Sequence, residues 1–201
     1  MKKEIEKGIN YLILNDSIIA RLINNHPKFT ISPNPSSFHA IVESVISQQL
    51  SVKAARTIYN RFIEMIGENY SHKDLLNLSV LKVKSIGISQ SKANYIHNIA
   101  SKMLSSPEYF ENLKNLSPEK IIEELTSIKG VGVWTAQMML IFQYGKLNIL
   151  PLNDVGILNA VKINYNLKDK PKKNELQNIS QQWHPYESIA CWYLWKSLNN
   201  E

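Results

Sequence analysis

Cysteine is almost absent from this sequence, and its scarcity excludes several kinds of site. The single cysteine, Cys191, lies in the apolar run IACWYLW. It cannot form a disulfide within the chain, and a cysteine-ligated iron–sulfur cluster, which needs about four thiolates, cannot form either. We expect Cys191 to be a buried, unreactive thiol rather than a nucleophile.

Glycine and long hydrophobic runs are also scarce. The sequence has 7 glycines among 201 residues, and no segment sustains the alternation of apolar and polar residues that a half-buried strand requires. No apolar segment reaches about 18 residues, the length that spans a bilayer, and the N-terminal stretch MKKEIEKGINYLILNDS has no signal-peptide core. The sequence therefore predicts an all-α, soluble, intracellular protein.

Acidic residues are outnumbered by basic ones. The 23 lysines and arginines exceed the 17 aspartates and glutamates, which gives a net charge of +6. An excess of positive charge favours a polyanionic partner, although it would also suit an anionic membrane surface. The length suits one compact unit or two small lobes that share a core.

The most informative stretch is residues 117–161, where the pattern predicts a helix, a hairpin, a second helix and a loop that ends at Asp154. Gly130 and Gly132 flank Val131, which indicates a tight reversal of the chain between two helices. A helix-hairpin-helix often contacts nucleic acid. Glycine also ends helices for structural reasons, so the pattern alone leaves both interpretations open.

Other segments carry local signals for helix ends. Ser117 suits an N-cap and Pro118 suits the first helical position. We expect Gly87 to close one helix and Ser89 to cap the next. Further helices are predicted over residues 3–25 with an interruption at 15–17, from residue 36 to about 62 with a break at SQQLS (47–51), and over about 185–198. Residues 81–104 are predicted to contain a small hairpin, SIGIS, that leads into a helix.

With these residues in view, the chain resembles the helix-hairpin-helix DNA glycosylases, and within them the DNA-3-methyladenine glycosylase II branch, which acts on alkylated bases. The segment IKGVGVWTAQMML followed by LPLNDVGI carries the strongest resemblance. Three more motifs extend it over most of the chain from about residue 33: VISQQLSVKAARTIYNRF (45–62), LKVKSIGISQSKANYIHNIA (81–100) and WHPYESIACWYLW (183–195).

The resemblance implies a two-lobed, all-α fold with a cleft between the lobes. The expected terminal lobe comprises residues 1–35 and 141–201, and the expected central lobe comprises residues 36–140 and ends in the helix-hairpin-helix at 117–145. No cofactor is expected, apart from a sodium or potassium ion at the hairpin when DNA is bound. By position, its ligands would be the backbone carbonyls of Thr126, Ile128 and Val131.

Asp154 is the expected catalytic residue. An aspartate before an apolar-periodic run is also a good helix N-cap, and the two roles are compatible. Cleavage of an N-glycosidic bond builds positive charge on deoxyribose, which a carboxylate beside C1′ stabilises while it orients or deprotonates water.

The hairpin is expected to bind DNA phosphates through backbone N–H groups, which carry no sequence information. The residues expected there are Lys129, Gly130, Val131, Gly132 and Val133. Lys129 stands where the family usually has proline.

Gln49, and as second choice Leu50, is the expected wedge that fills the gap left by an extruded base. Glutamines in a break between helices also simply solvate a loop. Lys82, Lys84 and Lys92 are expected on a solvated basic face or over a phosphate backbone.

The expected base pocket contains Trp134, Trp195, Met138 and Gln48. An indole ring attracts a positively charged alkylated base. In family members that also cut the DNA strand, a lysine that forms a Schiff base occupies the position of Trp134. Tryptophan has no such amine, so hydrolysis without strand cleavage is expected.

These features predict a monofunctional glycosylase for alkylated purines of the 3-methyladenine type, acting as a monomer on double-stranded DNA in base excision repair, with no membrane partner. It would be cytoplasmic and nucleoid-associated in a prokaryote and nuclear in a eukaryote. Three alternatives remain open: a glycosylase for uracil, hypoxanthine or an oxidised purine, a non-catalytic DNA-damage-binding protein, and a helical scaffold for other proteins.

Overall fold

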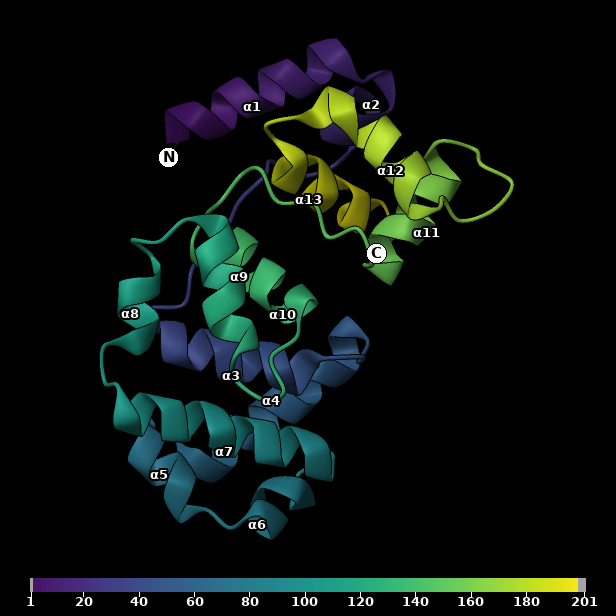
Figure 1. The fold of residues 1–201 in the computed structure, drawn as a ribbon. Coiled ribbons are helices and arrows are strands. Elements are labelled where there is room, and N and C mark those ends of the chain that lie inside the picture. The colour runs from purple at the N-terminus through teal and green to yellow at the C-terminus, as the bar shows by residue number, and fades with distance from the viewer. Residues whose placement is uncertain (1, 199–201) are drawn as a thin grey trace. The chain divides into compact units, whose positions relative to one another are not determined.

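The computed structural model describes residues 2–198, which form helices and no strand (Figure 1). The all-α fold predicted from the sequence is confirmed. The chain divides into two compact units. One runs from the N-terminal end of the chain to Ser32 and resumes at Gly145, and the other is the continuous segment Pro33–Tyr144.

The continuous unit is built around α3 and α7, which pack against each other. Ile41 and Val45 of α3 and Ile96 and Ile99 of α7 are fully buried and form the centre of the core. The helices of this unit are α3 (Ser37–Ser47), α4 (Val52–Ile66), α5 (His72–Asn77), α6 (Val80–Ser85), α7 (Gln90–Ser105), α8 (Tyr109–Leu113), α9 (Pro118–Thr126), α10 (Val133–Met138) and the π-helix η1 (Met139–Gln143).

Serine caps begin most helices of the continuous unit. The hydroxyl of Ser117 accepts the N–H of Lys120 and Pro118 takes the first turn of α9, as the sequence predicted. Gly87 adopts a φ of +102° between α6 and α7, and the hydroxyl of Ser89 caps α7. Both of these predictions are also confirmed.

The discontinuous unit contains α1 (Lys2–Asn15), α2 (Ser17–Asn25), α11 (Val155–Asn164), α12 (Lys173–Ser180), the 3₁₀ turn η2 (Gln181–Trp183) and α13 (Glu187–Ser197). Asp16 lies between α1 and α2, at the interruption predicted from the sequence. Its Oδ1 accepts the N–H groups of Ile18 and Ile19. Oδ2 of the same buried carboxylate accepts bonds from three side chains: Tyr165, Gln182 and Trp183.

The loop that leads to Asp154 is bonded to the start of α13. The backbone N–H of Ser188 donates to the carbonyl of Leu147 at 2.9 Å. The Ser188 hydroxyl donates to the carbonyl of Lys146 at 2.8 Å and accepts the N–H of Ile149 at 3.1 Å. These bonds fix the path of the chain as it approaches α11.

Candidate nucleic-acid interface and catalytic residue

A hairpin of residues 127–132 joins α9 to α10, and Gly130 is required for its shape. Gly130 has a φ of +105°, a backbone conformation that residues other than glycine rarely adopt. A Cβ atom at this position would lie 2.0 Å from Cγ of Tyr95 on α7. The hairpin therefore packs its backbone directly against an aromatic ring.

Gly132 has a different environment from Gly130. Its φ is −87°, which any residue can adopt, and a Cβ atom here would meet nothing within 4 Å among the described residues. Nothing within the described fold requires glycine at this position. The missing side chain leaves the backbone at the start of α10 open to an external group.

The backbone groups of the hairpin are partly used within the protein. The N–H of Val131 donates to the carbonyl of Ile128 at 2.9 Å, so this amide is engaged, contrary to the expectation that it would be offered to phosphate. Gly132 and Val133 stand at the N-terminus of α10, where N–H groups have no intrahelical partner.

Side chains from α7 and from the turn after α3 bond to hairpin carbonyls. Asn98 on α7 donates its amide N–H to the carbonyl of Lys129 at 3.0 Å, and Gln48 donates to the carbonyl of Gly130 at 3.2 Å. A carbonyl oxygen has two lone pairs, so the Ile128 carbonyl, which already accepts the N–H of Val131, can still serve a cation. The Ile128 carbonyl thus keeps a lone pair for the monovalent ion expected at the hairpin.

The turn between α3 and α4, residues Gln48–Leu50, holds the expected wedge. Gln49 is exposed and has a φ of +56°, an uncommon conformation for a residue with a side chain. Leu50 is 36% exposed. The side chain of Gln48 points instead toward α10, where its Nε2 donates to Oγ1 of Thr135 at 2.9 Å.

Asp154 is the N-cap of α11, as predicted, and is buried with only 7% of its surface exposed. Its Oδ1 accepts the backbone N–H of Ile157 at 2.7 Å. The same oxygen accepts the indole N–H of Trp195 on α13 at 2.9 Å. Two donors from different helices therefore fix the orientation of this carboxylate.

Gly156 was missed by sequence reasoning and shapes the surroundings of Asp154. A Cβ atom on Gly156 would lie 3.0 Å from Oδ1 of Asp154 and 3.1 Å from Cδ1 of Trp195. A side chain at this position would press on both partners of the indole–carboxylate bond. The glycine two residues after the aspartate, in NDVGI, is the signal that could have identified it.

The expected pocket residues fall on both units. Trp134 is half-buried in the first turn of α10, and Met138, one helical turn later, is 9% exposed. Gln48 lies in the same unit. Trp195 belongs to the discontinuous unit, where it contacts Asp154.

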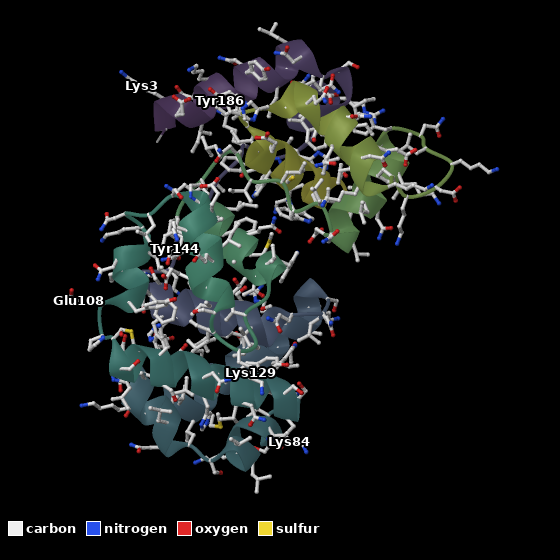
Figure 2. The ribbon with its side chains drawn as sticks, viewed as in Figure 1. Lys3, Lys84, Glu108, Lys129, Tyr144 and Tyr186 are labelled. Carbon is white, nitrogen blue, oxygen red and sulfur yellow. The ribbon has the colours of Figure 1, made fainter. Side chains whose placement is uncertain are left out.

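The lysines of the 81–104 segment differ in their surroundings. Lys82 and Lys84 are exposed in the last turn of α6, and Figure 2 shows Lys84 on the surface of the continuous unit and Lys129 on the hairpin. Lys92 departs from the expected solvated or phosphate-facing position, because its amine donates to backbone carbonyls inside the unit. Burial lowers the pKa of this amine below its ordinary value.

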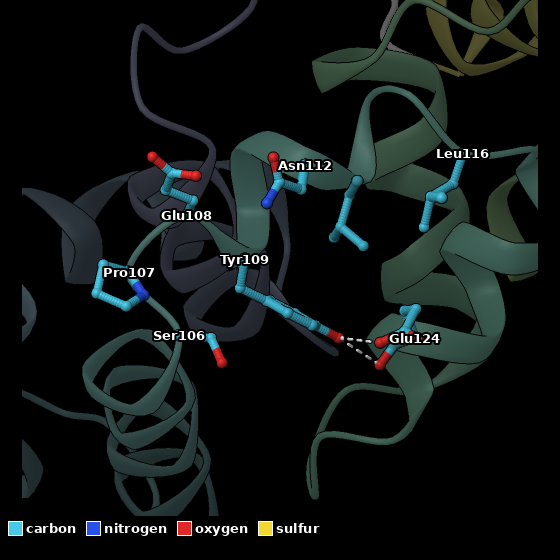
Figure 3. Close-up of a pocket in the computed structure, with 8 residues that line it drawn as sticks. Ser106, Pro107, Glu108, Tyr109, Asn112, Leu116 and Glu124 are labelled. Carbon is cyan, nitrogen blue, oxygen red and sulfur yellow. Dashed lines mark hydrogen bonds between the residues drawn. The ribbon is translucent and has the colours of Figure 1, made fainter.

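A hollow of about 650 Å³ opens beside α8 and α9 (Figure 3). Its lining includes Tyr109, whose hydroxyl donates to the backbone carbonyl of Glu124 at 2.8 Å, together with Leu113 and Leu116. None of the site residues expected from the sequence lines this hollow.

Cys191 is buried, as expected. Burial raises the pKa of its thiol, and the charges of Asp154 and Glu187 add to the effect. A thiol in these surroundings is protonated and unreactive.

Within residues 2–198, no cluster of three or more histidine, cysteine, aspartate or glutamate side chains is arranged to hold a metal ion. In the same range, no helix has the length and apolar character needed to cross a bilayer.

The family model for HhH-GPD superfamily base excision DNA repair proteins matches residues 42–185, which include the Gln48–Leu50 turn, the hairpin and Asp154. The chain belongs to this superfamily. The resemblance inferred from the four sequence motifs is therefore confirmed.

Individual relatives of this HhH-GPD chain have names that refer to alkylated bases. The alkylbase DNA glycosidase-like protein mag2 of Schizosaccharomyces pombe is 30% identical over 96% of this chain and 92% of its own. The putative DNA-3-methyladenine glycosylase YfjP of Bacillus subtilis is 28% identical over 90% of this chain, which spans 65% of that relative's length.

A solved structure extends the similarity to the fold. The 3-methyladenine DNA glycosylase Mag1 of Schizosaccharomyces pombe, in complex with abasic DNA, aligns with a TM-score of 0.85 at 30% identity. The alignment covers 95% of this chain and 96% of that one.

Proposed function

We propose that this HhH-GPD protein is a monofunctional DNA glycosylase that hydrolyses the N-glycosidic bond of alkylated purines of the 3-methyladenine type in base excision repair. The observation that carries the proposal is Asp154, a buried carboxylate held by two N–H donors at the start of α11. The names of the relatives support the class of substrate.

The hairpin is the proposed grip on the DNA backbone. Phosphate oxygens would accept the N–H groups of Gly132 and Val133, and the open space at Gly132 allows close approach. Lys129 and Gly130 belong to the same contact. A sodium or potassium ion, held by the carbonyls of Thr126, Ile128 and Val131, would add a bridge to phosphate.

Extrusion of the damaged base is assigned to the Gln48–Leu50 turn and the aromatic residues. Gln49 or Leu50 would fill the gap in the duplex, because both are exposed at the tip of the turn. Trp134 would stack on the cationic base, with Met138, Gln48 and Trp195 completing the pocket.

The proposed reaction is a hydrolysis at C1′. The bond from C1′ to the purine nitrogen breaks, and its electron pair leaves with the base, which departs neutral because alkylation made it cationic. Water adds to C1′ and loses one proton. The carboxylate of Asp154 would stabilise the positive charge that develops on the sugar and orient the water or accept its proton.

The reaction is proposed to end with an intact strand. Strand cleavage by this family uses a lysine amine, and the residue at the corresponding position here is Trp134. The chain is further proposed to act as a monomer, without an organic cofactor, on double-stranded DNA in the cytoplasm of a prokaryote or the nucleus of a eukaryote.

Base release from methylated DNA tests this proposal. DNA carrying labelled methyl groups is incubated with the wild type and with Asp154→Asn, and strand integrity is measured before and after alkali. We expect the wild type to release methylated purines and leave strands that break only in alkali. Asp154→Asn should be slower by about a hundredfold or more. Asp169→Asn, on an exposed loop, is the matched control and should retain full activity.

The main rival is a protein that binds damaged or abasic DNA without cleaving it. It predicts that neither wild type nor Asp154→Asn releases bases, while both bind the DNA. Faster release of uracil, hypoxanthine or an oxidised purine from single-lesion duplexes would overturn the substrate class. Strand breaks before alkali would overturn the assignment as monofunctional.

A further inference from the structure

Lys92 forms an internal contact that the proposed function does not use. It lies in the first turn of α7, and its Nζ donates to the carbonyl of Ile46 at 2.8 Å and to the carbonyl of Gln48 at 2.5 Å. Both carbonyls belong to the C-terminal end of α3 and the turn after it. Carbonyls at a helix C-terminus lack intrahelical partners and attract a cation.

The turn that Lys92 contacts contains a residue in a left-handed backbone conformation. Gln49 adopts a φ of +56°, and the N–H of Leu50 donates to the carbonyl of Ser47 at 3.2 Å. A left-handed conformation at a residue with a side chain costs free energy and persists where its neighbours hold it. The ammonium group on the carbonyl of Gln48 supplies such a restraint directly before Gln49.

The same face of α7 also holds the hairpin. Tyr95, one turn after Lys92, packs its ring against Gly130, and Asn98, one further turn on, bonds to the carbonyl of Lys129. Gln48 completes the connection with its bond to the carbonyl of Gly130. One helix therefore fixes both the turn that carries Gln49 and the hairpin.

We propose that Lys92 is a positioning residue that holds the Gln48–Leu50 turn in the shape needed to enter the duplex, at a fixed distance from the hairpin. This inference rests on the proposed function, because it assigns Lys92 to the extrusion step of that reaction. Lys92 itself contacts neither the base nor the reacting atoms.

The inference is tested with Lys92→Met, which keeps the length of the side chain and removes its donors, and with Lys92→Arg, which restores them. Single-turnover base release is measured for 7-methylguanine paired with cytosine and for the same base in a single-nucleotide bulge. Extrusion from the bulge needs less energy, since that base is already unpaired. We expect Lys92→Met to be slower by about tenfold on the paired duplex and by less than about threefold on the bulge. Lys92→Arg should recover most of the loss.

Lys73→Met is the control for the loss of one positive charge, because Lys73 is exposed on α5. It should behave like the wild type on both duplexes. An equal loss by Lys92→Met on both duplexes would overturn the inference and assign Lys92 a general structural role. Wild-type rates for Lys92→Met on the paired duplex would also overturn it.

A second measurement separates this inference from the proposed function. The fluorescence of 2-aminopurine next to an abasic-site analogue rises when a side chain enters the duplex, and no bond is cleaved. If the wild type releases no base but raises this signal, the proposed function fails. The inference about Lys92 then stands only if Lys92→Met weakens the rise and Lys92→Arg restores it. A signal that is the same in all three proteins overturns it.

Discussion

Trp195 donates its indole N–H to Oδ1 of Asp154 at 2.9 Å, across the space between the last helix and the start of α11. This bond and the cap bond from Ile157 converge on one oxygen atom. Trp195 therefore acts on the proposed catalytic carboxylate, in addition to its expected role as a wall of the base pocket.

Trp195→Phe is expected to slow base release by about tenfold, since a hydrogen bond to a charged group contributes about 1.5 kcal/mol or more. Phenylalanine keeps the ring but lacks the donor. Single-turnover release from methylated DNA measures the effect. In an Asp154→Asn background the same substitution should change nothing further, whereas an additive loss would show that the indole acts independently of Asp154.

Gly130→Ala should affect the stability of the fold, whereas Gly132→Ala should affect the binding of DNA. Alanine at position 130 would meet the ring of Tyr95 and a φ of +105°, so we expect a loss of about 2 kcal/mol or more in the free energy of unfolding. Alanine at position 132 should leave stability unchanged and weaken the binding of DNA. Urea unfolding and a DNA titration measure the two quantities. Equal stabilities for the two variants would contradict the assignment.

Asp16→Asn should destabilise the protein strongly. The buried carboxylate accepts five hydrogen-bond donors, and an amide would turn an NH₂ group toward some of them. We expect a loss of about 3 kcal/mol, measured by urea unfolding. Asp74→Asn is the contrast, because Asp74 is exposed in the capping box of α5, and its effect should be clearly smaller.

Glu43→Gln should stabilise the protein at neutral pH. Burial raises the pKa of the half-buried Glu43 carboxyl. Burial also raises the pKa of the neighbouring Tyr59 to about 12, and the charge of Glu43 adds to this effect. From the ordinary carboxyl pKa up to this raised value, the folded protein binds more protons than the unfolded chain. The contribution of Glu43 to stability therefore falls as the pH rises through this window.

Urea unfolding from pH 4 to pH 8 measures this difference. The advantage of Glu43→Gln over the wild type should be full at pH 7 and should shrink as the pH falls through the window. The exposed Glu64→Gln on α4 controls for the loss of one carboxylate. A stability difference that does not change with pH would contradict the role of the buried charge.

Local signals in the sequence predicted much of the secondary structure. Ser117 with Pro118, the interruption at Asp16 and the cap at Ser89 each depend on side chains within a few residues of the helix end they define. The order of the motifs also predicted the family. Such features need no knowledge of how distant segments meet.

The features that sequence reasoning missed depend on distant contacts. The amine of Lys92 reaches carbonyls more than forty positions earlier, and Trp183 bonds to Asp16 from the other end of the chain. Gln143, at the end of the π-helix η1, likewise bonds through its side chain to the backbone of the distant Asn34 at 3.0 Å and 2.9 Å. No periodicity of apolar residues encodes these partners.

The two hairpin glycines would respond differently to laboratory evolution. A library selected only for soluble, folded protein should keep Gly130, because the ring of Tyr95 excludes any side chain there. The same library should accept other residues at position 132. A library selected for survival under alkylation stress should keep both. The position at which the two selections diverge would thus mark, without any structure of a complex, where the backbone of this protein meets its partner.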